Sequence, residues 1–363
     1  MKREHTRAYL FGFSSWGFRL IRDFFPRELR IRLCRTLEEA RAEGLDAGGE
    51  IYAYPARMPV GLEAYAEERN LPLYRVEDGF IRSLTLGSSF FKPASMVFDS
   101  RGIYFDPSRP SDLEHILANR RFDRELLERA RKLRERILRS RLSKYNHLPH
   151  KTLTLDEAGS RKRLLVVGQV DDDLSILRGG YGYDSLKLLR RVRADRPDAF
   201  ILYKPHPDVV AGIREGRVAR SALAPYADRV VETASLDSCI EACDEVHTIT
   251  SLSGFEALMR GKEVHTYGMP FYAGWGLTVD ARTCARRTRR LELDALVAAV
   301  YLLYPRYVSL ETGESCGPEQ VLDEIARLQE RYFEDPLFRW RIDLTGRGAV
   351  VLRKILDRIR RRG

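Results

Sequence analysis

Short apolar runs alternate with helical patterns along most of the chain. Residues 9–13 form the first run, and further strand candidates cover residues 30–34, 50–54 and 72–76. A second series begins with RLLVV and continues in AFILYKPHP, DRVVE, DEVHTIT and KEVHTYG. Strands that alternate with helices are typical of parallel α/β sheets. The pattern therefore predicts two Rossmann-like α/β domains facing a cleft, where ligands bind beyond the carboxyl ends of the strands.

The helical segments suggest where these domains end. PSDLEHIL has an N-cap signal at Ser111, and the charged helix pattern that continues to residue 144 is best explained as a solvated helix face. A link follows near residues 147–160. We therefore expect an N-terminal domain over residues 1–155 and a C-terminal one over residues 156–320.

The remaining residues, 321–363, are expected to form C-terminal helices, and PEQVLDEIARLQERYF has a clear amphipathic pattern. The last stretch, AVVLRKILDRIRRRG, is apolar on one side and basic on the other. Packing on the protein explains its apolar residues, whereas the terminal arginines favour an anionic surface such as a bilayer.

Composition narrows the class of protein. Of 363 residues, 44% are hydrophobic, which excludes a disordered or fibrous chain. The formal net charge of +10 favours anionic partners without choosing among phosphate, nucleic acid and lipid. Neither a signal peptide nor a membrane span is expected. The five cysteines include no CxxC pair, and Cys239 and Cys243 are expected to be buried apolar residues rather than metal ligands.

Four polar clusters stand at the ends of strand candidates. In the first, VEDGFIRS, Glu77 and Asp78 precede Gly79, and Arg82 follows. A carboxylate in such a turn can accept a proton, with its pKa set by the neighbouring charges. A polar Asp-Gly turn without a catalytic role explains the same residues, and taken alone this cluster favours that interpretation.

The second cluster, GQVDDDLSILRGGYGYD, places Asp171, Asp172 and Asp173 after a strand candidate. A Mg²⁺ site is the less favoured interpretation, because the flanking residues offer no obvious further carboxylate ligands. Helix capping explains the aspartates equally simply, and so does a carboxylate nucleophile that attacks a substrate carbon.

The third cluster, YKPHPDV, holds Lys204 and His206 on either side of Pro205. Two prolines stiffen this backbone and fix both side chains in a conformation suited to phosphate, so we favour a functional interpretation over packing.

The fourth cluster, HTITSLSGFEALMRG, brings several hydroxyls to the start of a helix pattern, and Glu256 lies in its first turn, within reach of ribose hydroxyls. Such a helix start can bind an anion, whereas N-capping explains only one hydroxyl. The hydroxyls are those of Thr248, Thr250, Ser251 and Ser253.

Several common motifs are missing from the sequence: GxGxxG, Walker A, GxSxG and HExxH. Their absence argues against dinucleotide oxidoreductases, P-loop kinases, serine hydrolases and zincins. The remaining pattern suits a nucleotide whose single phosphate leaves.

Taken together, the motifs resemble those of capsule polysaccharide biosynthesis proteins of the KpsC kind, which are β-Kdo glycosyltransferases. The resemblance runs from Phe11 to about Tyr307 and rests on EDGFIRS, GIYFD, SKYN, GQVDDDLSI, YKPHPDV, TSLSGFEALMRG and YGMPFYAGWGLT. Family members often carry two related modules in tandem, whereas this chain has one, most similar to the C-terminal module.

The resemblance implies a GT-B fold that binds CMP-β-Kdo in its second domain, while the acceptor enters from the first. It implies a retaining transfer, with a β-2,7 linkage, to a Kdo-terminated glycolipid of the lyso-phosphatidylglycerol type in the oligo-Kdo linker of capsular polysaccharide. The expected place is the cytoplasmic face of the inner membrane of a Gram-negative cell, with peripheral attachment. Other capsule assembly proteins are expected as partners, and nucleic acid is not.

The resemblance also implies residue roles, some shared with bacterial sialyltransferases through an acidic-Asp-Gly turn, a His-Pro pair and a Ser/Thr pair. Asp173 is the nucleophile of a double displacement, and Glu77 or Asp78 handles the acceptor proton. Arg82 and Lys144 serve the Kdo carboxylate or the acceptor. The donor-binding residues are Gln169, Lys204, His206, Thr250, Ser251, Ser253, Gly254 and Glu256, of which His206 is also counted as catalytic. No cofactor or metal ligand is assigned, since Lys204 and His206 would neutralise the single phosphate.

Two other classes of function stay open from the sequence. A noncatalytic scaffold that binds CMP-sugar or glycolipid for capsule assembly predicts binding without turnover. A nucleic-acid-binding protein would rest only on the net charge and on arginine runs such as CARRTRR, which is weak support.

Overall fold

The computed structural model describes residues 6–82, 92–141, 152–210, 212, 214, 218–342 and 344. These residues form two compact units. The first holds the described residues of 6–103 and 300–344, and the second holds those of 104–299. The predicted domain boundaries, after residues 155 and 320, differ from this division. Lys144 and the predicted basic helix at 349–363 lie outside the described residues.

The first unit is built on a mixed sheet with the order β13-β12-β5-β4-β3-β1-β2. Strands β1 to β4 run parallel, whereas β5, β12 and β13 each pair antiparallel with the strand before them in this part of the sheet. The strands are β1 (Arg7–Phe11), β2 (Arg30–Cys34), β3 (Glu50–Ala53), β4 (Leu73–Asp78), β5 (Ser95–Asp99), β12 (Arg306–Val308) and β13 (Ser315–Cys316).

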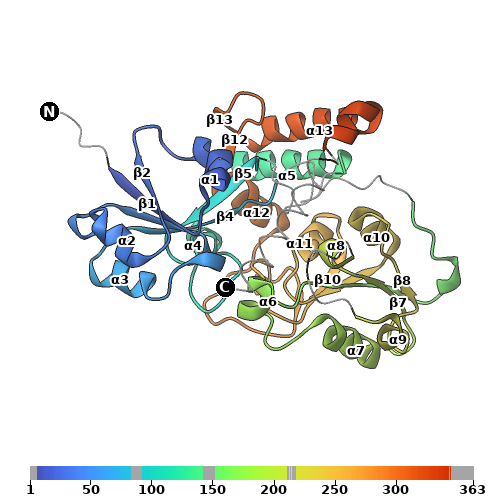
Figure 1. Cartoon of the computed structure of the whole chain (residues 1–363). Coiled ribbons are helices and arrows are strands. Elements are labelled where there is room, and N and C mark those ends of the chain that lie inside the picture. The colour runs from blue at the N-terminus through green and yellow to red at the C-terminus, as the bar shows by residue number, and fades with distance from the viewer. Residues whose placement is uncertain are drawn as a thin grey trace. The chain divides into compact units, whose positions relative to one another are not determined.

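Alternate residues of these strands feed two apolar layers. On one face, Leu10 and Val76 pack with Phe24 and Phe25 after α1, and on the other Ile51 packs with residues of α2 and α3 (Figure 1). The helices of this unit are α1 (Ser15–Ile21), α2 (Leu37–Ala42), α3 (Leu62–Glu68) and α13 (Pro318–Glu334), with short 3₁₀ turns at Arg22–Phe24, Leu45–Ala47 and Pro55–Arg57. The amphipathic pattern predicted for 318–333 is confirmed by α13.

The return of the chain to the first unit is fixed by β12 and α13. β12 pairs with β5, and the buried Ser309 hydroxyl donates a 2.7 Å hydrogen bond to Glu324 of α13. The Tyr304 hydroxyl donates a 2.7 Å bond to Asp99 at the end of β5. These contacts join segments that are far apart in the sequence, so the first unit is discontinuous along the chain.

The second unit has an all-parallel sheet with the order β11-β10-β9-β6-β7-β8. The central strands β6 and β7 are mainly apolar, as expected where helices cover both faces of a sheet. Figure 1 shows α7 and α9 on one side of this sheet and α10 and α11 on the other. The strands are β6 (Arg163–Val167), β7 (Phe200–Lys204), β8 (Arg229–Val230), β9 (Glu245–Thr248), β10 (Glu263–Thr266) and β11 (Val279–Asp280).

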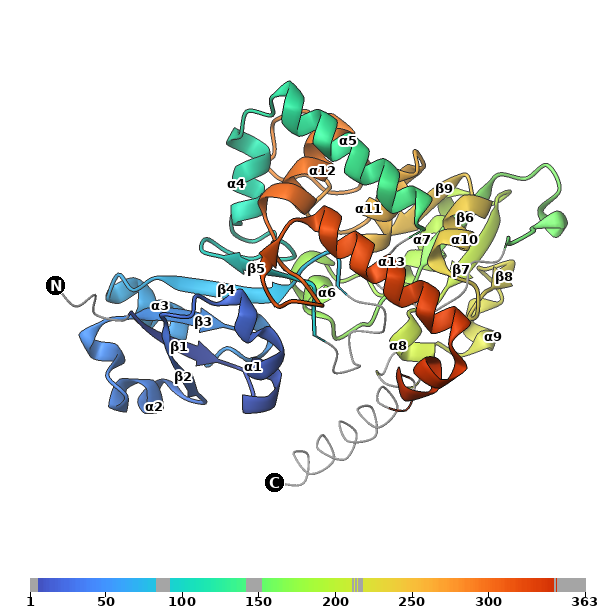
Figure 2. The ribbon, with the colours of Figure 1, turned by 90° about the horizontal axis from the view of Figure 1, so that it is seen from above.

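Helices before and after this sheet belong to the same unit. Figure 2 shows α5 beside α12, and Arg134 of α5 forms a 2.8 Å ion pair with Asp294 of α12. The α-helices of the unit are α4 (Asp112–Asn119), α5 (Arg124–Arg139), α6 (Leu174–Gly179), α7 (Ser185–Asp195), α8 (Pro207–Val210), α9 (Arg220–Leu223), α10 (Leu236–Ala242), α11 (Leu252–Met259) and α12 (Leu293–Val297). A π-helical turn, Ala298–Leu303, follows α12 and crosses from one unit to the other.

The fold class predicted from the sequence is thus confirmed: two Rossmann-like α/β units with helices late in the chain. The prediction of a parallel sheet was wrong for one side of the first unit, where β5, β12 and β13 pair antiparallel. β5 is a buried five-residue strand whose direction no local pattern records, and β12 and β13 have only three and two residues. Ser111 caps α4 as predicted, and Cys239 and Cys243 are buried. Burial raises the pKa of the Cys239 thiol to about 11 and that of Cys243 to about 12.

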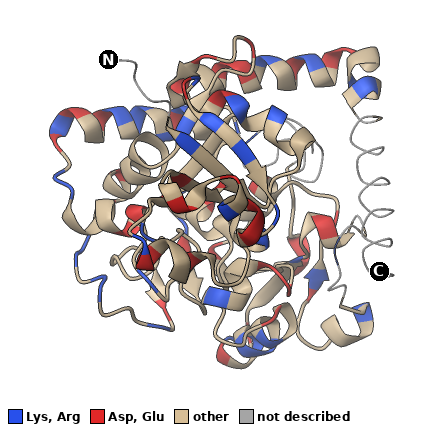
Figure 3. Cartoon of the chain, turned by 60° about the vertical axis from the view of Figure 1, so that its left-hand side comes forward, with Lys and Arg blue, Asp and Glu red and all other residues tan. Residues whose placement is uncertain are grey.

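Charges of both signs are interspersed along the helices (Figure 3). On α5, for example, Arg131 forms ion pairs with Glu128 at 2.8 Å and with Glu135 at 2.5 Å. The charged run is therefore a solvated helix face, while Leu133 and Ile137 are buried on the other side. No helix within the described residues has the length and apolar character needed to cross a membrane.

Candidate active site

The acidic turn of the first unit is braced by its neighbours. Glu77 and Asp78 end β4, beside the end of β3. The Tyr54 hydroxyl donates a 2.7 Å hydrogen bond to Glu77 Oε1, which also accepts the Asp78 backbone N–H at 3.1 Å. The Glu77 carboxylate and burial hold the pKa of Tyr54 well above its ordinary value. Tyr54 therefore remains a hydrogen-bond donor to this carboxylate across the neutral pH range.

The other carboxylate of the turn has a cationic partner. Asp78 Oδ2 forms a 2.5 Å ion pair with Arg82 Nε, and the Arg82 side chain is buried. Gly79 lies against Ser95 of β5 so closely that a Cβ at this position would overlap the serine side chain. Because Arg82 is already paired with Asp78, binding of a substrate carboxylate by Arg82 would require the guanidinium either to bind both carboxylates or to release Asp78.

A hydrogen-bonded clamp joins the ends of β6 and β9 in the second unit. The Gln169 amide, which follows β6, donates from Nε2 to Thr250 Oγ1 at 3.0 Å and accepts the Thr250 backbone N–H at 2.9 Å. Both residues are buried. The amide thus fixes the backbone and the hydroxyl of Thr250 together at the carboxyl edge of the sheet.

This clamp continues to Asp173. The Thr250 hydroxyl donates to Ser175 Oγ at 3.2 Å, and Ser175 Oγ donates to Asp173 Oδ1 at 2.7 Å. Asp173 is the N-cap of α6 and also accepts the Ser175 backbone N–H at 2.9 Å on the same oxygen. The carboxylate is half-buried and oriented by the network.

The three consecutive aspartates have different surroundings. Asp172 is exposed and forms a 2.6 Å ion pair with Arg214. Burial, with the Asp184 charge, raises the pKa of Asp171. Of the three, Asp173 is the one that the hydrogen-bond network connects to Gln169 and Thr250. The structure thus gives the three aspartates different surroundings, which the sequence run alone does not show.

The start of α11 holds the remaining hydroxyls. Ser251 is its N-cap: its Oγ accepts the Ser253 N–H at 3.2 Å and donates to Ser253 Oγ at 3.0 Å. Thr248 Oγ1 accepts the Ser251 N–H at 3.2 Å. Gly254 lies against Tyr272, whose hydroxyl donates a 2.5 Å bond to the Ser251 carbonyl, and a Cβ on Gly254 would overlap that hydroxyl.

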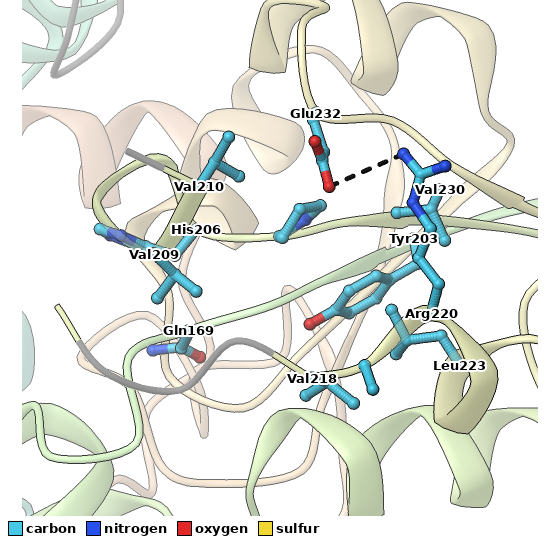
Figure 4. A pocket seen from close by; sticks show the side chains of 12 residues that line it. Gln169, Tyr203, His206, Val209, Val210, Val218, Arg220, Leu223, Val230 and Glu232 are labelled. Carbon is cyan, nitrogen blue, oxygen red and sulfur yellow. Dashed lines mark ion pairs between the residues drawn. The ribbon is translucent and has the colours of Figure 1, made fainter. Parts of the chain in front are cut away.

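Lys204 and His206 leave the end of β7 toward different partners. The buried Lys204 donates from Nζ to the Ala234 carbonyl at 2.7 Å, and burial lowers its pKa. His206 Nδ1 accepts the Asp208 N–H at 3.1 Å, and its ring lines a pocket of about 200 Å³ with Gln169 (Figure 4). Lys204 is not among the described residues that line this pocket.

The same pocket has an apolar floor and a charged rim. Tyr203 and Leu223 contribute apolar surface, and Arg220 and Glu232 form a 3.9 Å ion pair at one side (Figure 4). Glu256, assigned to the ribose, is buried within α11, with only 4% of its surface exposed. Its assigned role stays a prediction, as does that of Lys144, which lies outside the described residues.

Comparison with known proteins decides the family. The sequence profile described as "Capsule polysaccharide biosynthesis protein" matches residues 51–307. The chain belongs to this family. The matched region contains the acidic turn, the clamp and the α11 start, so the site described above lies within the family's shared region.

Two curated relatives cover most of the chain. The chain is 41% identical to the capsule polysaccharide modification protein LipA of Neisseria meningitidis serogroup B over 90% of its own length. It is 43% identical over 72% of its length to the lipopolysaccharide-processing protein LpsZ of Rhizobium meliloti. It spans 47% of LipA and 60% of LpsZ, about half the length of the curated relatives it matches.

Two solved structures cover nearly the whole chain. One is the β-Kdo 2,7 transferase of Thermosulfurimonas dismutans KpsC, with 36% identity and a TM-score of 0.72. The other is the β-Kdo 2,4 transferase of the same protein, with 30% identity and a TM-score of 0.76. Each covers 89% of this chain and is itself covered to 99%. The family assigned from the sequence and the fold shared with these two structures therefore agree.

Sequence reasoning missed three residues that hold the site in this family member. Ser175 links Thr250 to Asp173, Tyr54 holds Glu77, and Tyr272 holds the Ser251 carbonyl. The Asp-x-Ser spacing of a helix cap was a usable signal for Ser175. Tyr272 lies in the quoted motif YGMPFYAGWGLT, although the motif does not indicate its partner. Tyr54 was detectable only from the pairing of β3 with β4, because it lies in no local motif.

Proposed function

We propose that the chain is a retaining β-Kdo glycosyltransferase that transfers Kdo from CMP-β-Kdo to a β-Kdo-terminated glycolipid. The observation that carries the proposal is the network from Gln169 through Thr250 and Ser175 to Asp173, at the carboxyl edge of the second sheet. Ligands of open α/β sheets bind at this edge. The proposal is supported by the similarity to two solved Kdo transferases over 89% of the chain.

The first chemical step is assigned to Asp173. Both of its hydrogen bonds from Ser175 end on Oδ1, so Oδ2 is the oxygen that we assign to attack the anomeric carbon. A bond forms between Oδ2 and that carbon while the bond to the phosphate oxygen breaks, and CMP leaves with the electron pair. The bonds to Oδ1 orient the carboxylate before the attack.

The second step returns the sugar to the acceptor. A hydroxyl of the terminal Kdo attacks the anomeric carbon, the ester bond to Asp173 breaks, and Glu77 or Asp78 takes the hydroxyl proton. Two inversions leave the β configuration of the donor in the product. Donors at the start of α11, with Lys204 and His206, are proposed to stabilise the departing phosphate without a metal ion.

The linkage and the setting are part of the proposal. Identity is higher to the 2,7 transferase than to the 2,4 transferase, and we propose a β-2,7 linkage on this basis. TM-scores have the opposite order, but they compare backbones rather than the side chains that select an acceptor hydroxyl. The acceptor is proposed to be a lyso-phosphatidylglycerol-type glycolipid at the cytoplasmic face of the inner membrane.

The test is transfer to a fluorescent acceptor that ends in β-Kdo, with CMP-Kdo generated in the same tube. NMR of the product should show a new β-linked Kdo at the 7-position. An α-linked product would contradict the double displacement, and a 2,4 linkage would contradict only the linkage assignment. CMP binding without transfer to either kind of terminus would instead indicate a noncatalytic scaffold.

Asp173→Asn isolates the proposed nucleophile. Transfer should fall by about 10³-fold or more, because an amide cannot form the covalent intermediate. Asparagine caps helices as well as aspartate does, so the thermal midpoint should barely change. Asp172→Asn is the matched control and should keep transfer near the wild-type rate, since Asp172 is exposed. Equal rates in both variants would remove Asp173 from the mechanism.

A further inference from the structure

Two neighbouring strands of the second unit carry the same four residues side by side. β9 reads Glu245–Thr248 and β10 reads Glu263–Thr266, both with the sequence EVHT. The strands are parallel, and their register pairs Glu263 with Glu245 and His265 with His247. Residues two apart on a strand share a face of the sheet. The two Glu-x-His pairs therefore lie next to one another on one face.

Their polar atoms converge on a small volume. Glu245 Oε2 lies 3.1 Å from His247 Nε2 and 3.6 Å from His265 Nε2, and the three ligand atoms are all within 4.8 Å of one another. Glu263 Oε1 lies 2.8 Å from His265 Nε2. Four ligands around a tetrahedral zinc ion, at 2.0–2.1 Å from it, are separated by roughly 3.3 Å. The observed spacings bracket that value.

We propose that Glu245, His247, His265 and Glu263 form a binding site for a divalent transition metal ion of the Zn²⁺ class. Imidazole nitrogens and carboxylate oxygens are ligands that zinc accepts. Glu245 and His247 are 1% exposed, so two of the ligands are held rigidly inside the unit. Glu263 lies at the surface and provides the path by which an ion enters.

A supporting partner orients the buried histidine. The Tyr267 hydroxyl lies 3.1 Å from His247 Nδ1, and in the metal-free chain His247 Nε2 donates to the Glu245 carboxylate at 3.1 Å. Metal binding would remove the Nε2 proton, and the Tyr267 hydroxyl would then accept a hydrogen bond from a protonated Nδ1. Metal-binding histidines usually have such a partner on the second nitrogen. The rings of His247 and His265 stack at 4.4 Å, with an angle of 10° between their planes. This stacking keeps both Nε2 atoms at the same end of the pair.

Two cations near Glu245 compete with the metal. Lys162 Nζ contacts Glu245 Oε1, and Arg196 Nε lies 4.0 Å from Oε2. The proposed ligand is Oε2, so Lys162 binds the other oxygen of the same carboxylate. The Lys162 side chain is 52% exposed and can move into solvent when an ion binds. Removing this ammonium should therefore strengthen metal binding.

The site has the character of a structural zinc site. Glu245, His247 and His265 offer three ligand atoms within 4.8 Å of one another. Glu263, which contacts His265, would supply the fourth. Four protein ligands would close the coordination shell and leave no position for a substrate. Glu245 begins β9, whereas Thr250 follows its opposite end, so the ion would tie β9 to β10 away from the proposed donor residues. The expectation that transfer itself needs no metal is a separate prediction, and this site does not bear on it.

The test measures Zn²⁺ binding by the full chain after removal of metal with a chelator. Competition with a chromophoric chelator should show tight binding at one site, Zn²⁺ should raise Tm, and Co²⁺ should give the intense visible absorption of a tetrahedral complex. Glu263→Gln and His265→Gln should weaken that binding, His265→Gln by about 100-fold or more. His115→Gln, which alters an exposed histidine on α4, should bind as the wild type does.

Several outcomes would overturn the proposal. The first is a wild-type chain that binds no Zn²⁺ tightly. Another is unchanged affinity in both Glu263→Gln and His265→Gln, which would place the ion elsewhere. Because Glu263 is exposed, its variant should fold even where the histidine variant does not. Lys162→Met should bind Zn²⁺ more tightly, and equal or weaker affinity would contradict the assignment of Glu245 as a ligand.

Discussion

The two adjacent carboxylates of the acidic turn differ in their partners, and this difference predicts different roles. Glu77 accepts a hydrogen bond from the neutral Tyr54 hydroxyl, whereas Asp78 is paired with the buried Arg82 guanidinium. Oδ2 of Asp78 is occupied by the Arg82 guanidinium, whose buried charge needs this carboxylate as its partner. Glu77 is therefore the better candidate for the acceptor proton, and Asp78 the better candidate for holding the turn.

Glu77→Gln and Asp78→Asn separate these roles. Glu77→Gln should slow transfer by about 10²–10⁴-fold, the usual contribution of a general base, with little loss of stability. Asp78→Asn leaves a buried guanidinium without its carboxylate, which should cost about 3–5 kcal/mol of unfolding free energy. Transfer rates with chemical denaturation curves make the comparison. A larger rate loss in Asp78→Asn at a temperature where both variants are folded would reverse the assignment.

Lys204 predicts a pH dependence of donor binding. Burial lowers its pKa below the ordinary lysine value of about 10.4, so its ammonium loses the proton at a lower pH than an exposed lysine does. A bound phosphate favours the charged form. CMP affinity should therefore be greatest below the pKa of Lys204 and fall as pH rises through it.

Calorimetric titration with CMP between about pH 7 and about pH 10 measures this dependence. Lys204→Met should bind CMP weakly and lose the alkaline decline, because the titrating group is gone. Lys187→Met, at the exposed start of α7, should keep both the affinity and the decline. A wild-type affinity that stays constant over this range would show that Lys204 does not contact the phosphate.

At the scale of elements, α11 is seated by a glycine. Gly254 leaves room for the Tyr272 hydroxyl, which holds the Ser251 carbonyl at the helix start. Gly254→Ala places a methyl group against that hydroxyl and should cost about 1–3 kcal/mol, the usual penalty of overpacking. The transfer rate should fall as well, because the added methyl group would displace Ser251 and Ser253 at the start of the helix.

A double-mutant cycle with Tyr272→Phe tests this packing. Deleting the hydroxyl relieves part of the overlap, so the double variant should lose less stability than the sum of the single variants. Gly17→Ala in α1 is the control: its Cβ would approach only the Ser14 hydroxyl, at 3.1 Å, and helix propensity improves, so the net effect should be small. Strict additivity in the cycle would show that Gly254 and Tyr272 are not energetically coupled.

Several of the parallel strands were predictable because they are apolar runs, as in RLLVV for β6 and FILYK for β7. By contrast, β12 and β13 have three and two residues and take their conformation from pairing with distant segments, which no local pattern records. In the candidate site, the position of these residues after strands correctly predicted that Gln169, Asp173 and Thr250 lie at one edge of the second sheet. Sequence could not show that Lys204 turns toward Ala234, because side-chain direction at a strand exit depends on neighbouring loops.

At the scale of the whole molecule, the second unit should fold without the first. Residues 104–299 contain its complete sheet together with α4, α5 and α12. Glu114 of α4 pairs with Arg286 at 2.6 Å and with the buried Arg287 at 3.0 Å. These contacts lie within the unit but across the predicted domain boundary at residue 155.

Two fragments distinguish the alternative boundaries. A fragment of residues 104–299 should unfold cooperatively, whereas one of residues 156–320 should be unstable, because it keeps Arg287 buried without Glu114 and removes α5 from α12. Loss of one partner of a buried ion pair alone costs about 3–5 kcal/mol, a large part of the stability of most domains. Thermal unfolding followed by circular dichroism measures both fragments. A Glu114→Gln change in the longer fragment removes the same carboxylate without altering the length of the fragment, so it should reproduce part of that loss of stability. Cooperative unfolding of residues 156–320 at the same midpoint as residues 104–299 would instead support the boundary predicted from the sequence.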